Sequence, residues 1–234
     1  MVIKLIVILS IWKRNGEMNQ NEKVKINVGI NISLKHKTFL WLWGKCGTTH
    51  MTQILKGFDF KFYLVENNNL LLKNNHIVQD HSCYVFPGHE NFKLLAAIRN
   101  PYAKFFSEFI FTNNTEKIEC NQKNKERFRE DLENRLNKRL RFTENCCDFF
   151  DREPDYPVRL ENLFEDYSKI PFIVESDYYK SGRLEEKTKV RVNVSNEDEF
   201  RWKKFYTQQT ADMVYYRMPR YFELFGYDKN SWQQ

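Results

Sequence analysis

Twice along this 234-residue chain, a short apolar run of strand-forming residues ends in a turn that leads directly into a helical pattern. The first run is Thr38–Trp43 (TFLWLW), which a glycine-bearing turn joins to a helical pattern over His50–Lys56. The second run is Lys93–Arg99 (KLLAAIR), after which Asn100 and Pro101 open another helix. Strands that alternate with helices in this way indicate an α/β fold, a P-loop-like parallel sheet flanked by helices.

The length and the composition favour one domain over residues 31–234, preceded by an apolar segment and linker over residues 1–30. Residues 1–12 (MVIKLIVILSIW) are too short to cross a bilayer, which takes roughly 20 residues. Two interpretations of residues 1–12 stay open: a β-strand, or the remnant of a signal sequence or membrane anchor. Association with a membrane and the cellular location are left open with them.

Other segments complete the expected domain. Residues 112–150 form a helical insertion, in which four apolar residues recur every fourth position and predict a helix packed on the core: Phe128, Leu132, Leu136 and Leu140. Strands are expected at Ser82–Phe86 and from Val158, and the Asn-rich stretch Asn67–Asn75 is expected to be a loop. The C-terminal part is predicted to be helical, with Pro219 kinking or splitting the helix.

The charge balance favours an anionic ligand. Lys and Arg outnumber Asp and Glu by 37 to 31, which gives a formal net charge of +6. A nucleotide, a sulfated glycan or a nucleic acid would suit such an excess. However, the chain has no block of six like charges, so we expect no nucleic-acid partner. No Cys or His spacing resembles a metal site either, and no metal is expected.

The first motif is Gly44-Lys45-Cys46-Gly47-Thr48-Thr49-His50, directly after the first apolar run. Glycine in a strand-to-helix turn lets backbone N–H groups close around an anion at the helix N-terminus. Lys45 adds a cation, and the Thr48 and Thr49 hydroxyls add donors. The Walker form of a nucleoside-triphosphate loop requires Lys after the glycine, but here Lys45 lies two residues before Gly47.

The second motif runs from Arg99 through Asn100-Pro101-Tyr102 to Ser107. Arg99 ends the strand and suits a charge-assisted pair with a phosphate. Ser107, about two helical turns further on, offers a hydroxyl to the same group. The alternative interpretation is a strand-end arginine that pairs with a nearby carboxylate.

Together these motifs resemble the sulfotransferase superfamily, which uses PAPS (3′-phosphoadenosine-5′-phosphosulfate). The K-x-G-T-T order resembles its 5′-phosphosulfate loop, and R-[ND]-P-[YF] followed by Ser resembles its 3′-phosphate element. Residues 159–166 resemble its R-x-E-[ND]-L-x-x-D segment. Residues 192–195 (VNVS) and 214–228 resemble the C-terminal part of the carbohydrate branch.

This resemblance implies transfer of a sulfuryl group from PAPS to an acceptor hydroxyl, on a carbohydrate in that branch, without a metal. It implies a donor site formed by eight residues: Lys45, Cys46, Gly47, Thr48, Thr49, His50, Arg99 and Ser107. Lys45 would stabilise charge on the leaving phosphate.

The general base is not assigned by the sequence. His89 and His81 rank first, because His89 is expected near the C-terminal edge of the sheet and His81 just before the Ser82–Phe86 strand. His76 and Glu66 are further candidates.

Two other functions stay open at this point. One is a P-loop nucleotide kinase, which the position of Lys45 disfavours. The other is a non-catalytic protein that keeps the fold and binds anionic glycans.

Overall fold

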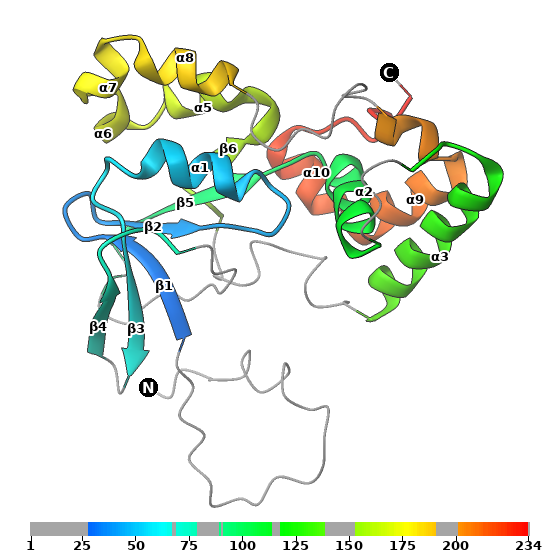
Figure 1. Ribbon diagram of the computed structural model, residues 1–234, viewed down its shortest axis with the longest axis horizontal. Coiled ribbons are helices and arrows are strands. Elements are labelled where there is room, and N and C mark those ends of the chain that lie inside the picture. The colour runs from blue at the N-terminus through cyan, green and yellow to red at the C-terminus, as the bar shows by residue number, and fades with distance from the viewer. Residues whose placement is uncertain are drawn as a thin grey trace, which may run out of the picture.

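The computed structural model describes residues 28–66, 69–78, 89, 91–113, 118–138, 153–190 and 201–233. These residues form an α/β protein, in which helices flank a six-stranded mixed sheet of order β4-β3-β1-β2-β5-β6 (Figure 1). The strands are β1 (Val28–Ser33), β2 (Thr38–Trp41), β3 (Lys61–Glu66), β4 (Asn69–Asn74), β5 (Lys93–Ile98) and β6 (Tyr156–Arg159). The α/β class is therefore confirmed.

The sheet is mixed, and the expected parallel pairing is present in only three of its six strands. Strands β2, β5 and β6 pair in parallel, whereas β1, β3 and β4 pair antiparallel with their neighbours. The connections explain the difference. Only residues 34–37 separate β1 from β2, and such a short link joins antiparallel strands only, because a parallel pair requires a long crossover. The parallel half is the half that contains both motifs.

The Asn-rich stretch is a strand rather than the predicted loop. In β4, Leu70, Leu71 and Leu72 pair with β3, and the asparagines lie at the two ends of the strand. As the last strand on its side, β4 leaves Leu71 and Leu72 exposed. An edge strand with one neighbour tolerates the polar composition that suggested a loop.

Helices gather in two groups, which Figure 1 shows above the parallel strands and to their right. One group contains α5 (Leu163–Tyr167), α6 (Pro171–Val174), α7 (Asp177–Lys180) and α8 (Arg183–Lys189), close to α1 (Thr48–Leu55). The other contains α2 (Pro101–Thr112), α3 (Gln122–Lys138), α9 (Gln208–Arg217) and α10 (Pro219–Phe225). Short 3₁₀ turns are η2 (Leu160–Asn162) and η3 (Arg201–Phe205). Pro219 is the first residue of α10, so the expected split is confirmed.

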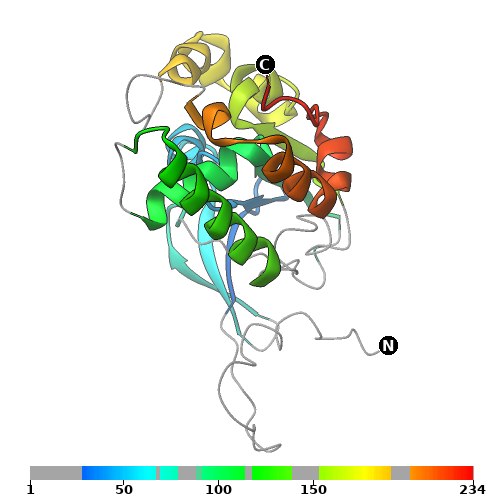
Figure 2. The same ribbon diagram turned by 90° about the vertical axis from the view of Figure 1, so that its right-hand side faces the viewer.

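The helix expected within residues 112–150 is α3, and its apolar face is buried as predicted. Phe128, Leu132 and Leu136 are each at most 2% exposed. The Phe128 ring packs against Phe106, Phe109 and Phe205, which joins α3 to α2 and η3. Figure 2 views this helical group from its outer side, with α3 and α9 in front of the sheet.

Several expectations lie outside the described residues: the N-terminal segment up to residue 27, the Ser82–Phe86 strand, Leu140 and the segment 192–195. Within the described part of the chain, no helix has the length and apolar character needed to cross a membrane.

Candidate functional site

The loop between β2 and α1 makes a tight turn at the carboxyl end of β2. The Cys46 N–H donates to the Trp43 carbonyl at 3.2 Å, and the Met51 N–H donates to the Gly47 carbonyl at 3.0 Å. Two residues of the loop have left-handed backbone conformations, Lys45 with φ 64° and Gly47 with φ 76°. Glycine adopts this conformation without steric cost, which explains its place at the start of α1.

Gly47 is also required by close packing. A Cβ at this position would overlap the Cδ1 atom of Leu160. Leu160 belongs to the segment 159–166, so this segment packs directly on the loop. The structure thus brings two of the sequence motifs into contact.

The N-terminus of α1 has the features of an anion site. Gly47 is the N-cap residue and has no side chain to cap the helix, and the first turn contains no acidic residue. Amides of a first helical turn lack intrahelical acceptors and carry partial positive charge. Thr48 is buried and Thr49 is half-buried in this turn. The Thr48 carbonyl accepts a hydrogen bond from the Thr52 hydroxyl at 2.8 Å.

Arg99 connects the second motif to the first. Its Nη1 atom donates to the Lys45 carbonyl oxygen at 2.9 Å. Because β2 and β5 are parallel neighbours, their carboxyl ends lie at the same edge of the sheet, and the two motifs follow these ends. Tyr221 of α10 fixes the Arg99 backbone, since its hydroxyl donates to the Arg99 carbonyl at 3.0 Å and accepts from the Arg99 N–H at 3.3 Å.

The turn after Arg99 is held by residues from the two downstream segments. The Asn100 side-chain oxygen accepts from the Tyr102 N–H at 3.0 Å and caps α2. The Asn100 N–H donates to Glu161 at 2.9 Å, and the Tyr227 hydroxyl donates to the other Glu161 oxygen at 2.9 Å. The segments 159–166 and 214–228 therefore meet the second motif at one place.

The loop and the strand end concentrate positive charge. In the described residues, neither Lys45 nor Arg99 has a carboxylate within ion-pair distance. Burial and the neighbouring Arg99 charge lower the pKa of Lys45, and the Glu108 carboxylate partly offsets this effect. A bound anion would stabilise both cations.

Ser107 lies on the side of α2 that faces the loop. Three residues earlier, the Lys104 ammonium is 4.0 Å from the centre of the Trp43 ring. Four residues later, the Phe111 ring centre is 4.1 Å from the Lys45 Nζ atom. Residues three or four apart share a helix face, so Ser107 lies between these two contacts.

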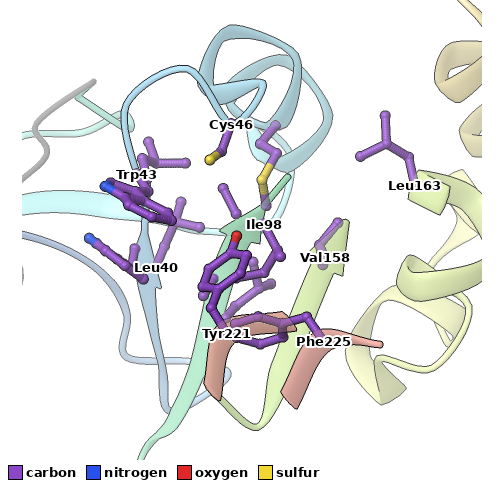
Figure 3. Close-up of a cluster of buried hydrophobic side chains, with 14 of the residues drawn as sticks. Leu40, Trp43, Cys46, Ile98, Val158, Leu163, Tyr221 and Phe225 are labelled. Carbon is purple, nitrogen blue, oxygen red and sulfur yellow. The ribbon is translucent and has the colours of Figure 1, made fainter. Parts of the chain in front are cut away.

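Two residues expected at the donor site have their side chains in the interior. Cys46 is 1% exposed and faces the apolar cluster drawn in Figure 3, and burial raises the pKa of its thiol to about 12. His50 is 5% exposed and hydrogen-bonds to the backbone of Lys187 in α8. Burial lowers the pKa of His50. Cys46 and His50 can therefore face a ligand only through their backbones.

The structure does not bring His89 to this edge of the sheet. His89 lies four residues before β5, and its ring contacts Phe92 at a centroid distance of 4.6 Å. Phe92 in turn contacts Phe39, near the start of β2. Since a strand rises about 3.3 Å per residue, the length of β5 separates His89 from Arg99. The expectation that His89 lies near the C-terminal edge was wrong.

The other candidate bases differ in position. His76 is exposed and follows β4, whose last residue pairs with Phe62 near the start of β3. Glu66 ends β3, which runs in the same direction as β2 but is separated from it by β1. His81 lies outside the described residues.

A buried charge network lies next to the loop and was not predicted from the sequence. Lys104 is 2% exposed, and its ammonium is 2.6 Å from Glu108, which also contacts Arg135 of α3 at 3.4 Å. The spacing of Lys104 and Glu108, four residues apart on a helix, was a signal for an ion pair. Glu161 and Tyr221 were missed as well, because their partners are distant in the sequence.

No group of three or more His, Cys, Asp or Glu side chains suited to a metal ion occurs in the described ranges. Comparisons with models of protein families, with curated proteins and with solved structures found no match.

Proposed function

We propose that this protein is a sulfotransferase with the P-loop-like fold of that superfamily, and that it transfers a sulfuryl group from PAPS to an acceptor hydroxyl. The observation that carries the proposal is the hydrogen bond from Arg99 to the Lys45 carbonyl. This hydrogen bond joins a loop that resembles phosphate-binding loops to an arginine 54 residues away at the end of a strand. Both lie at the sheet edge where open α/β sheets bind ligands. Neither motif alone would support the proposed function as strongly.

In this proposal the donor lies along the carboxyl ends of β2 and β5. The backbone amides of residues 46–49 hold the 5′-phosphosulfate at the start of α1. Arg99 pairs with the 3′-phosphate, and Ser107 donates its hydroxyl to the same group.

The reaction is an in-line displacement at sulfur. The acceptor oxygen forms a bond to sulfur while the bond between sulfur and the phosphate oxygen breaks, and the acceptor proton passes to a base that is not assigned. Negative charge develops on the leaving phosphate oxygen, where the Lys45 ammonium stabilises it.

A carbohydrate acceptor is the favoured substrate class. Its support is the resemblance of residues 214–228 to the carbohydrate branch. Tyr221 and Tyr227 of this segment contact Arg99 and Glu161. These two tyrosines thus contact residues beside the donor motifs.

Thermal unfolding tests the proposal with two nucleotides. PAP (adenosine 3′,5′-bisphosphate), the product of the donor, should stabilise the protein. At about 100 times its Kd, a ligand adds about 2.7 kcal/mol, which raises Tm by roughly 5–10 °C for a domain of this size. ATP with Mg²⁺ should have little effect. A shift with ATP and Mg²⁺ but none with PAP would favour the nucleotide kinase instead.

A further inference from the structure

Phe111 is an exposed aromatic residue beside the loop. It lies near the C-terminal end of α2 and is 72% exposed, whereas Phe109, two residues earlier, is 1% exposed. The Lys45 Nζ atom lies 4.1 Å from the centre of the Phe111 ring. An ammonium over an aromatic face at this distance is attracted to the ring.

The surroundings of Lys45 disfavour its charged form, and the contact with the Phe111 ring acts against this effect. Arg99, at the end of β5, repels the ammonium, and partial burial disfavours its charged form. Glu108 of α2 acts in the opposite direction, but its two oxygens contact Lys104 at 2.6 Å and Arg135 at 3.4 Å. The Phe111 ring is then a direct contact that stabilises the Lys45 charge without adding a competing anion.

We propose that Phe111 is a positioning residue for Lys45, whose ring keeps the Lys45 side chain protonated and directed along α2, beside Ser107. The use of this ammonium in sulfuryl transfer rests on the proposed function, but its contact with the ring does not. An anion entering the loop would find the cation already in place. Since Phe111 is largely exposed, its side chain contributes little to the core.

The test is the pH dependence of Lys45 acetylation, measured by brief labelling with acetic anhydride and mass spectrometry of the peptides. Only the neutral amine reacts, so the midpoint of the rate-against-pH curve reports the pKa of Lys45. Phe111→Leu removes the ring and keeps an apolar side chain, whereas Phe111→Tyr keeps a ring. Tyr216→Leu is the matched control, because Tyr216 is an aromatic residue with 75% exposure on α9.

Phe111→Leu should move the midpoint to lower pH, by a two- to fivefold change in the ionisation constant, which corresponds to about 0.5–1 kcal/mol. Phe111→Tyr and Tyr216→Leu should keep the midpoint of the parent. A change that affects only the plateau at high pH would show that the ring merely shields Lys45 from the reagent. That result, or an unchanged midpoint in Phe111→Leu, would overturn the proposal.

The same assay separates this inference from the proposed function. PAP added to the parent protein should slow the acetylation of Lys45, because the phosphosulfate loop is then filled. If PAP gives no protection, the donor site is contradicted, while the comparison of the variants still decides the role of the ring. If PAP protects and the midpoint stays the same in Phe111→Leu, only the inference about Phe111 fails.

Discussion

Lys45 takes a backbone conformation that residues other than glycine seldom adopt, with φ 64°. In this conformation its carbonyl oxygen accepts the hydrogen bond from Arg99, and its ammonium contacts Phe111. Such a conformation costs roughly 1–2 kcal/mol and persists where surrounding contacts fix it. The strained residue of this loop is the residue to which we assign the charge stabilisation.

Lys45→Ala tests this role under the proposed function. Alanine keeps the Cβ atom, so the backbone strain at this position is unchanged. The value of kcat should fall roughly 10²–10³-fold, because the interaction is strongest in the transition state. PAP affinity should change less, since the backbone amides still hold the 5′-phosphate. Steady-state kinetics with labelled PAPS measures both.

The controls for this variant are Lys45→Arg and Lys56→Ala. Lys45→Arg should recover little activity, because a planar guanidinium does not replace a compact ammonium in a tight turn. Lys56 is exposed at the other end of α1, and its removal should leave kcat at the value of the parent. An unchanged kcat in Lys45→Ala would leave the loop with a binding role only.

The sequence predicted correctly the positions of the residues at strand ends. Lys45 follows the first apolar run and Arg99 ends the second, so the parallel pairing of β2 and β5 determines that they meet. The predicted position of His89 was wrong, because it was inferred from the strand expected before His89 rather than from β5, which follows it. Cys46 and His50 belong to the motif, but no spacing shows that their side chains point into the core.

At the scale of elements, the sequence predicted β2, β5 and the helices after them. It missed β1 and β3, and it placed a loop where β4 lies. The reason is that these strands depend on one another: β3 pairs with both β1 and β4, and short strands of this kind are stabilised mainly by their neighbours.

The strand expected from Val158 is β6, which begins at Tyr156 and includes Pro157. Proline is tolerated there because β6 is an edge strand of the described sheet.

A comparison of two glycines at helix starts distinguishes the cost of backbone strain from the cost of a steric overlap. Gly47 and Gly182 are the N-cap residues of α1 and α8, and both have φ 76°. A Cβ at Gly182 would meet no atom of the described part of the chain within 4 Å, whereas one at Gly47 would overlap Leu160. Gly182→Ala should cost roughly 1–2 kcal/mol of unfolding free energy, and Gly47→Ala about 1–3 kcal/mol more.

Denaturant unfolding measures this difference. Leu160→Ala combined with Gly47→Ala should recover part of the loss, because it removes the overlapping atoms. Equal costs for Gly47→Ala and Gly182→Ala would mean that Leu160 does not restrict the loop.

At the scale of the whole molecule, buried histidine links stability to pH. His50 is 5% exposed, its Nε2 atom has no hydrogen-bond partner among the described residues, and burial lowers its pKa. The unfolded state, in which the pKa is near 6.5, therefore binds the proton more readily than the folded state. The stability that His50 contributes is complete above this pH and is lost as the pH falls below it. His36, whose pKa burial also lowers, acts in the same direction.

His50→Gln should reduce the loss of unfolding free energy between pH 7 and pH 5. For one titrating group, the slope of the unfolding free energy against pH is at most about 1.4 kcal/mol per pH unit. His76→Gln is the control, since His76 is exposed. The check is denaturant unfolding at several pH values. The same slope in His50→Gln as in the parent would contradict burial of a neutral histidine between α1 and α8.

We propose that the β2–α1 loop and Arg99 form one binding site for the donor nucleotide. Calorimetric titration with PAP tests it in the parent, in Arg99→Ala and in Arg129→Ala, an exposed arginine of α3. Removing one partner of a desolvated charge pair costs on the order of 2–5 kcal/mol, so Arg99→Ala should weaken PAP binding about 30-fold or more. Arg129→Ala should bind PAP as the parent does. Equal affinity in Arg99→Ala and the parent, or no binding of PAP to the parent, would contradict the claim.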